Sequence, residues 1–517
     1  FIYHASNIFF HIAATLTAYY FFISLLREGG ISFIAAAIFA VHPLHTESVA
    51  WIKGRDDILF TIFYLLALTM YLKHESSILW KKQLYFLASL LLYILSLFSK
   101  ELAITLPLSI ILYQAIFKKL NLFKLIPFIV VSAIYIGLRT FVLGQVAQQE
   151  EYWGGSLYAT ILTMTKGIAH YMKLTYLPIN QCADYLFPIS QGLDIWIIIS
   201  LIFISLYLII LFVRGNGYAL WGGLFFLLSL LPVLNIIPIK AIIAERFLYL
   251  PLIGFCLVFV YLLSRILPDV RIFRIMSFII ISLLFALTTQ RSSVWKDEYS
   301  LWSDTVRKYP GNPRAHYGLG VAYTSKGMKE EAVREYKRSI ELGPYYPDTY
   351  NALGLEYYKK GMEEGKDKNM VEAAARLYIA ALKIDPGHRD ARYNLALLYH
   401  ELGSLDDAIK EYSELLRYRP DDFDSLNSLG LAFFQKGQFE RSLSLYRKSL
   451  DIEPDSVTPY NNIGTAHAVM GRVEEAEKWF KGAIEKDPES AEAYYNLGFL
   501  YQKNGRLDEA VKAYKKA

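Results

Sequence analysis

Cysteine and charge are both scarce in this sequence, and each scarcity argues against a class of protein. Two cysteines in 517 residues argue against a disulfide framework, and no zinc-ligand spacing is present. Charged residues make up 20% of the chain and apolar residues 54%, which is too apolar for an ordinary soluble enzyme of this length. The net charge of +5 falls mostly between apolar runs, so we expect no nucleic-acid partner.

The charge that is present is distributed unevenly along the chain. Residues 1–290 carry 31 charged side chains, whereas residues 291–517 carry 70. This contrast predicts a polytopic membrane domain followed by a polar domain. The sequence begins at Phe1 rather than Met and stops at Ala517 within a repeating pattern, so we expect both ends to be trimmed from a longer protein.

Long apolar runs predict the membrane crossings, because a spanning helix needs about 20 apolar residues and must satisfy its own backbone hydrogen bonds. The run at 157–177 contains Lys166, His170 and Lys173, which fits a re-entrant or interfacial helix better than a crossing. We predict about ten crossings in an all-α membrane domain over residues 1–290. They lie roughly at residues 5–26, 31–41, 58–72, 83–98, 102–117, 125–138, 195–213, 218–234, 247–263 and 275–289.

Basic residues collect in alternate loops, and this bias predicts the orientation. One set of loops holds eleven basic and three acidic residues, and the other holds eight and nine. Cytoplasmic loops are enriched in Lys and Arg, so we assign the first set to the cytoplasm. With ten crossings, the polar domain lies on the opposite face. Residue usage favours a bacterial inner membrane with a periplasmic polar domain over an endoplasmic reticulum membrane with a lumenal one.

Residues 311–517 repeat a pattern of small and aromatic positions. A small residue recurs at 320, 354, 396, 430, 464 and 498, in steps of 34 with a single step of 42. Each unit continues with another small residue, an aromatic residue and a proline. This pattern is typical of tetratricopeptide repeats and predicts six of them, the last incomplete, after a connector at 291–310. The extra residues around Gly361–Asn369 are expected to bulge from a turn between paired helices.

Three asparagines share one position of the repeat: Asn394, Asn462 and Asn496. Repeats of this kind stack into a superhelix whose concave surface suits peptides. One interpretation is a ladder of asparagines that grips the backbone of an acceptor peptide by bidentate hydrogen bonds. The other is ordinary repeat consensus, in which each asparagine bonds its own turn. Both interpretations stay open on the sequence.

Four clusters of polar and ionisable residues fall on the predicted non-cytoplasmic face. Charged groups at bilayer depth are expensive, so such residues are candidates for function. For Lys100-Glu101 and for Glu245-Arg246, the structural alternative is an ion pair that holds helix ends. The clusters are His42–Asp57, Lys100–Glu101, Arg139–Tyr185 and Asn235–Arg246.

The chemistry of these clusters favours a lipid-linked phosphate, since no catalytic-triad spacing, phosphate-binding Gly-rich loop or redox motif accompanies them. A departing phosphate needs cations, and a carboxylate can take the proton from an acceptor hydroxyl. Four side chains are predicted to bind the donor phosphate: Lys53, Arg55, Arg139 and Arg246. Three carboxylates are predicted to shape or support the site: Glu47, Asp56 and Glu101.

A divalent metal is a weaker possibility at the first cluster. His42 and His45 are spaced i, i+3 with Glu47 nearby, which gives plausible reach to one ion. Pro43 breaks any regular helix there, so we assign no metal ligand. No other cofactor is expected.

At these residues the sequence resembles the transmembrane and tetratricopeptide-repeat-containing O-mannosyltransferases and their bacterial relatives. The resemblance implies a GT-C glycosyltransferase fold, in which a sugar moves from a polyprenyl or dolichyl phosphate donor to Ser/Thr hydroxyls beyond the membrane, with inversion. It also implies that mannose is the sugar and that the repeats bind acceptor protein. The segments that carry it are His42–Glu47, Gly54–Asp56, Lys100-Glu101 with Thr105, Leu177–Tyr185, Glu245–Pro251, and Arg291, Trp295 and Trp302.

One departure from this family concerns the catalytic base. The acidic residue most often assigned that role lies in the first long external loop, and this sequence begins after that point, so the base stays unassigned. A competing hypothesis is a membrane-anchored repeat scaffold for an envelope complex, with the polar clusters acting only as interhelical bonds. Ten crossings are hard to justify for a scaffold. Transport is disfavoured because the charges gather at one face and not at the midplane.

Overall fold

The computed structural model describes residues 2–143, 152–239, 241–363, 365 and 367–517. Every regular element among them is helical, so the predicted all-α class is confirmed. The chain divides into two compact units, residues 1–315 and 316–517, and each is described by itself. The first unit is the membrane unit and the second is the repeat unit.

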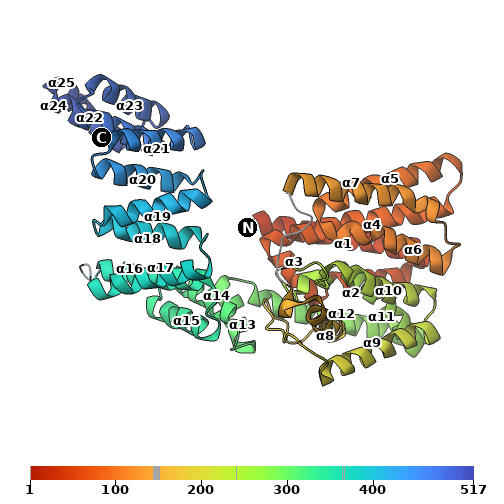
Figure 1. Ribbon diagram of the computed structural model, residues 1–517. Helices are drawn as coiled ribbons and strands as arrows, with labels where there is room; N and C mark the ends of the chain where they lie inside the picture. Colours follow the sequence, from red (N-terminus) through yellow and green to blue (C-terminus); the bar gives the residue numbers. More distant parts are fainter. Residues whose placement is uncertain (1, 144–151, 240, 364, 366) are drawn as a thin grey trace. The chain divides into compact units, whose positions relative to one another are not determined.

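In its described residues, the membrane unit contains thirteen α-helices joined by short 3₁₀ turns, and α14 (Pro313–Ser325) begins at its end (Figure 1). The helices are α1 (Ile2–Leu26), α2 (Gly29–Ala40), α3 (Thr46–Ala50), α4 (Arg55–Ser76), α5 (Leu79–Ser99), α6 (Leu106–Phe117), α7 (Ile126–Leu143), α8 (Leu157–Tyr176), α9 (Ile195–Arg214), α10 (Gly217–Leu230), α11 (Leu252–Ile266), α12 (Val270–Val294) and α13 (Glu298–Lys308). The 3₁₀ turns are η1 (Pro43–His45), η2 (Ile52–Gly54), η3 (Glu101–Thr105), η4 (Leu122–Leu125), η5 (Trp153–Gly155), η6 (Leu231–Val233) and η7 (Glu245–Leu248).

Apolar helices of membrane-spanning length make up much of this unit. Six described helices are long and apolar enough to cross a bilayer, and a seventh candidate is the pair Gly29–Ala40 and Pro43–Ala50, bent by 49°. Three shorter apolar helices follow the same composition, Glu101–Phe117, Gly217–Val233 and Leu252–Ile266. Each of the ten predicted crossings therefore overlaps one of these helices, and the protein is a membrane protein. Ten crossings remain a prediction.

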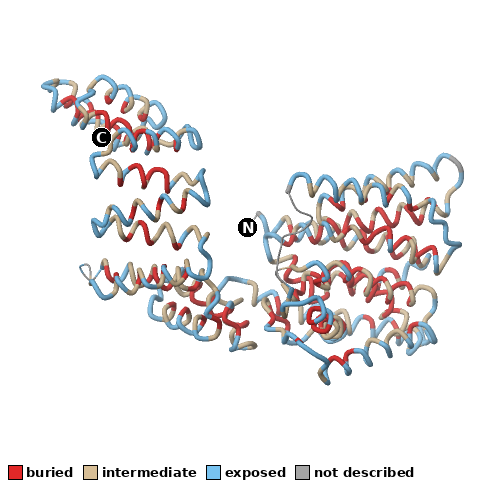
Figure 2. Tube along the Cα trace, viewed as in Figure 1, coloured by how far each residue is buried: buried red, intermediate tan, exposed pale blue. Residues whose placement is uncertain are grey.

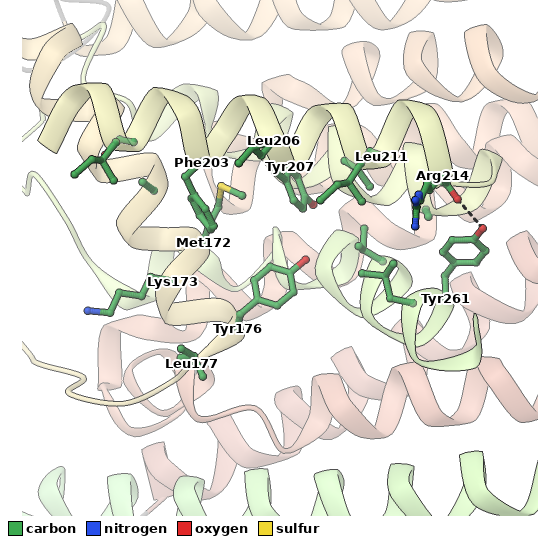
Figure 3. Close-up of a pocket in the computed structure, with 18 residues that line it drawn as sticks. Met172, Lys173, Tyr176, Leu177, Phe203, Leu206, Tyr207, Leu211, Arg214 and Tyr261 are labelled. Carbon is green, nitrogen blue, oxygen red and sulfur yellow. Dashed lines mark hydrogen bonds between the residues drawn. The ribbon is translucent and has the colours of Figure 1, made fainter. Parts of the chain in front are cut away.

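Burial separates inner from peripheral helices. Two thirds of the apolar window of α4 is buried, whereas only 11% of the windows of α7 and α12 is buried. Figure 2 shows this contrast along α4 and α7. An apolar side chain left exposed on a peripheral helix can face lipid, so the sequence needs no polar face there. The helix over the run at 157–177 is α8, which crosses the direction of α9 in Figure 3.

The repeat unit is built from antiparallel helix pairs, one per predicted repeat. Small and aromatic positions explain the pairing: a Cβ on Gly430 would lie 2.5 Å from the ring of Tyr446, and one on Gly464 would lie 2.6 Å from Phe480. The aromatic ring of the second helix thus occupies the space that the glycine of the first leaves. The pairs are α14 with α15 (Lys329–Leu342), α16 (Pro347–Glu363) with α17 (Lys368–Ile384), α18 (Arg389–Glu401) with α19 (Leu405–Tyr418), α20 (Phe423–Gln435) with α21 (Phe439–Ile452), α22 (Val457–Val469) with α23 (Val473–Lys486), and α24 (Ala491–Lys503) with α25 (Leu507–Tyr514).

The extra residues of the second repeat do not form the bulge expected from the sequence. Helices α16 and α17 have 17 residues each, whereas α18 has 13 and α19 has 14. The inserted residues lengthen both helices toward their shared turn, because extending an existing helix adds one hydrogen bond per residue. Residues 364 and 366 of this stretch lie outside the described residues.

Candidate functional site

The short turns η1, η2, η3 and η7 overlap three of the predicted polar clusters, His42–Asp57, Lys100–Glu101 and Asn235–Arg246. Turn η7 is in contact with η1 and α3, and η3 is in contact with α4. Segments far apart in sequence therefore meet at one end of the helices. The ion pairs formed there join residues from different segments of the sequence.

The first pair joins Glu47 to Arg246. The Glu47 carboxylate accepts a hydrogen bond from the Arg246 backbone N–H at 2.9 Å and a second one from its guanidinium. Glu47 is buried, and the guanidinium lies 5.2 Å from the ring centroid of Trp51. Burial acts to lower the pKa of Arg246, but the charges of Glu47 and Asp57 outweigh it and raise that pKa. The arginine is thus a permanent cation, fixed in orientation at both backbone and side chain.

The second pair joins Asp57 to Lys100. The Lys100 ammonium bonds one oxygen of Asp57, and it lies 3.6 Å from Asp56. Asp57 is 1% exposed, and its other carboxylate oxygen has no hydrogen-bond partner among the described residues. Asp56, on the next position of the helix, is about half exposed. Successive helical residues point about 100° apart, which places Asp57 inward and Asp56 toward solvent.

Glu101 and Arg139 form a more exposed pair beside the second one. An Arg139 guanidinium nitrogen lies 3.4 Å from Glu101 and 3.2 Å from the Tyr135 hydroxyl. The Glu101 side chain is 57% exposed. An ion pair of this kind exchanges readily with solvent or another anion.

Glu245 is the centre of a buried network behind Arg246. One of its oxygens accepts hydrogen bonds from the Cys182 backbone N–H and the Tyr185 hydroxyl, both at 2.7 Å, and lies 3.4 Å from Arg291. Arg291 also lies 3.4 Å from Asp304, which joins α12 to α13. Burial raises the pKa of Glu245 to about 7, against the opposing effect of the Arg291 charge.

The structural alternative for Lys100-Glu101 and Glu245-Arg246 is an ion pair that holds helix ends, and all four residues do form ion pairs, each with a residue of another segment. In the described residues, Lys100 pairs with Asp57, Glu101 with Arg139, Glu245 with Arg291, and Arg246 with Glu47. The physical reason is local geometry. Lys100 is extended and Glu101 opens a 3₁₀ turn, so adjacent side chains point to different neighbours.

The two cations of the η2 region differ in their surroundings. Arg55 donates to the Ser6 hydroxyl at 2.7 Å and to the Asn7 side-chain oxygen at 3.3 Å, so α1 holds it. Asn7 is fully buried and also bonds the backbone oxygens of Val49 and Trp51. Lys53 is exposed, and within the described residues it has no ion pair.

The two histidines considered for a metal are buried in separate surroundings. His42 bonds the Thr175 backbone oxygen at 3.1 Å. His45 packs against Phe39 and Tyr249, with ring centroids 4.4 and 4.3 Å away, and neither of its nitrogens has a hydrogen-bond partner in the described part of the chain. Across the described residues, no group of three or more His, Cys, Asp or Glu side chains could hold a metal ion.

The asparagines of the repeats occupy partly buried positions. Asn394 donates to the side chain of Asn351 at 2.9 Å, which links two adjacent repeats. Asn496 lines a groove together with Tyr495 and Phe499. Asn462 is half-buried on α22. The first contact supports a structural role for Asn394, and the groove leaves Asn496 accessible to a peptide.

Sequence reasoning gave no individual role to four residues of these networks: Asp57, Lys100, Arg291 and Asp304. Arg291 carried a usable signal, because an arginine near the end of an apolar helix is costly unless it is paired. The sequence does not show which of Asp56 and Asp57 is buried, because the apolar run that follows does not fix the rotation of the helix.

Comparison with known proteins covers both units. The family models described as TPR repeat match residues 322–361, 398–437, 430–471 and 469–505, and one described as Tetratricopeptide repeat matches 366–417. A protein O-mannosyl-transferase of Caenorhabditis elegans is 30% identical over 364 residues, covering 66% of this chain and 51% of the relative. That match is longer than the repeat unit, so it extends into the membrane unit. The chain is therefore similar to the protein O-mannosyl-transferases in both its membrane unit and its repeat unit.

A human protein O-mannosyl-transferase is a further relative. Protein O-mannosyl-transferase TMTC1 of Homo sapiens is 25% identical over 417 residues, covering 68% of this chain and 47% of the relative. The chain therefore spans about half the length of the curated relatives it matches. Among solved structures, the TPR protein YrrB matches 39% of this chain and 97% of its own at 18% identity, with a TM-score of 0.33.

Proposed function

We propose that this protein is a GT-C membrane glycosyltransferase that moves mannose from a polyprenyl or dolichyl phosphate to Ser/Thr hydroxyls of proteins, with inversion. The observation that supports this proposal is the buried Glu47–Arg246 pair, adjoining Asp57–Lys100, in a chain similar to the protein O-mannosyl-transferases. Transfer would take place on the non-cytoplasmic face, which we infer to be the periplasmic side of a bacterial inner membrane.

The donor phosphate gains negative charge as the sugar departs, and fixed cations stabilise that charge. Arg246 suits this role best among the four predicted ligands, because Glu47 orients it while 23% of its side chain stays exposed. Lys53 adds an exposed ammonium from η2. Arg55 and Arg139 would exchange their present partners, Asn7 and Glu101, for phosphate oxygens.

The carboxylates have supporting roles in this proposal. Glu47 fixes Arg246, while Asp56 and Glu101 balance the charge of Lys100 and Arg139. The base that takes the proton from the acceptor hydroxyl is not assigned to any of them. In a single displacement, the hydroxyl attacks the anomeric carbon from the side opposite the phosphate, which inverts its configuration.

The repeat unit would bind the acceptor protein. Asn496 supports this part of the proposal, because it lies beside exposed aromatic rings in a groove, where an amide can bond an extended backbone. Asn394 and Asn462 complete the proposed set at the same repeat position. The partners are thus a lipid-linked sugar in the membrane and proteins at the repeats.

Transfer of labelled mannose tests the proposal. The full-length protein in lipid nanodiscs receives polyprenyl-phosphate mannose and envelope proteins, beside Arg246→Gln and the control Arg265→Gln from the predicted cytoplasmic face. We expect Arg246→Gln to lose about a hundredfold or more of the rate, as for removal of a charge-stabilising donor elsewhere, and Arg265→Gln to retain it. Absence of transfer by the unaltered protein, with every sugar on this carrier, would favour the scaffold.

A further inference from the structure

A large groove lies against α9, away from the ion pairs described above. Its volume is about 700 Å³, and its walls come from α8, α9, α10 and α11 (Figure 3). A volume of this order is typical of sites for small ligands, of roughly 300–1,000 Å³. Neither Glu47, Asp57, Lys100 nor Arg246 lines it. The groove is therefore a separate feature from the candidate transferase site.

The groove exists because α9 meets its neighbours near its two ends. At one end, Leu211 packs so close to α10 that a Cβ on Gly223 would lie 2.2 Å from it. At the other, Asp194 caps α9 and lies 3.4 Å from Lys166 of α8. The lining on α9 runs from Ile199 to Arg214, which at 1.5 Å per residue is about 22 Å. The groove along α9 is long and lined mostly by apolar side chains, as a lipid chain requires.

Two cations line the groove, Lys173 of α8 and Arg214, and Arg214 lies at the end formed by α9 and α11. Arg214 lines the groove, its side chain is exposed, and it has no ion pair within the described ranges. The Tyr261 hydroxyl donates to the Arg214 backbone oxygen at 3.0 Å, which fixes this end (Figure 3). A guanidinium matches phosphate oxygens by two parallel hydrogen bonds, so the unpaired Arg214 is complementary to a phosphate group.

The predicted orientation selects the source of that phosphate. Arg214 belongs to the loops that the Lys and Arg bias assigns to the cytoplasm. The cytoplasmic leaflet is rich in anionic phospholipid, and basic pockets between membrane helices on that side bind such headgroups. The donor sugar, by contrast, is proposed to react at the opposite face. The positive charge of Arg214 and its predicted cytoplasmic side therefore fit an anionic phospholipid of the cytoplasmic leaflet.

We propose that this groove is a binding site for one anionic phospholipid, with a lipid chain along α9 and the phosphate at Arg214. The bound chain fills the space between α9 and the rest of the unit. It would add packing contacts for the lining residues Phe203 and Leu206, whereas Tyr207 already packs against the core.

Photolabelling by a lipid probe tests this site in the full chain. The protein is reconstituted in phosphatidylcholine nanodiscs with a small fraction of phosphatidylglycerol that carries a photoreactive acyl chain, and labelled peptides are mapped by mass spectrometry. Leu206→Trp fills the groove, and Ile202→Trp is its control on an exposed position of α9 outside the lining. Arg214→Gln removes the cation, and Arg265→Gln is its control on α11.

We expect label concentrated in α9 and α11, reduced about tenfold by Leu206→Trp and by Arg214→Gln and unchanged by both controls, as loss of one charge-assisted contact predicts. A photoreactive phosphatidylcholine should label the groove weakly. Equal labelling by both lipids, or equal labelling of Arg214→Gln and Arg265→Gln, would overturn the proposal. Displacement of the probe by polyprenyl phosphate but not by phosphatidylglycerol would overturn it in favour of the donor lipid.

Discussion

The two units satisfy their charged side chains in opposite ways. In the membrane unit, Glu47 and Arg246 are 199 positions apart and Glu245 and Arg291 are 46 apart, and both carboxylates are buried. In the repeat unit, pairs such as Lys486–Asp455 join neighbouring repeats at exposed positions. The buried ion pairs of the first unit therefore join distant parts of the sequence. The exposed pairs of the second unit, such as Lys486–Asp455, lie on the surface of adjacent repeats.

The largest effect on stability should come from breaking a buried pair. Arg291→Leu leaves Glu245 and Asp304 without their shared cation, and removal of one partner of a buried pair costs about 3–5 kcal/mol. Seven of the eight tryptophans lie in the membrane unit, so tryptophan fluorescence during thermal unfolding in detergent reports this unit. The double variant Arg291→Leu with Glu245→Gln should recover part of the loss, and no recovery would contradict the pairing.

A second prediction concerns the packing of the repeats. Gly430→Val places side-chain atoms where the Tyr446 ring lies, since even a Cβ would be 2.5 Å away, and overpacking costs about 1–3 kcal/mol. Urea unfolding followed by circular dichroism measures it. Gly430→Ala should cost less, because the third repeat carries Ala396 at this position opposite Tyr412. If valine is tolerated without loss, the packing argument is wrong.

The buried carboxyl also predicts a pH dependence for the membrane unit. The pKa of Glu245 is raised to about 7 in the fold from its ordinary value of 4.5, so between these values the folded state binds more protons than the unfolded state. Its contribution to stability is therefore present below the lower value and is lost as the pH rises through 7. The melting temperature should fall from pH 5.5 to pH 8, by more in the unaltered protein than in Glu245→Gln. Parallel slopes in the two proteins would refute this assignment.

The smallest effect belongs to an exposed pair of the repeats. Lys486→Ala removes the contact with Asp455, whose side chain is 90% exposed. Such a pair is worth about 1 kcal/mol or less, and less again in salt. Chemical denaturation at low and high ionic strength measures the difference. A loss as large as that of Arg291→Leu would remove the contrast between the two units.

The sequence predicts the repeat unit more completely than the membrane unit. A glycine such as Gly464 and the ring that fills its space, Phe480, recur at fixed spacing, so the helix pairs follow from one period. The apolar runs likewise indicate each membrane helix. The sequence does not predict which aspartate binds Lys100 most closely. Asp56 and Asp57 differ only by about 100° of rotation about the helix axis, and a helix that is apolar on all sides does not fix that rotation. The packing of α4 against α1, α5 and η3 fixes that rotation.

The most direct test of the proposed transferase is a double-variant cycle on Glu47 and Arg246. Mannose transfer from polyprenyl phosphate by the full-length protein is measured for Glu47→Gln, Arg246→Gln and both together, with Asp455→Asn as a control on the repeats. If the two residues form one phosphate-binding unit, each single variant loses most of the rate and the double variant loses little more, while the control is unchanged. Transfer that persists at the unaltered rate in all of them would contradict the assignment of the site.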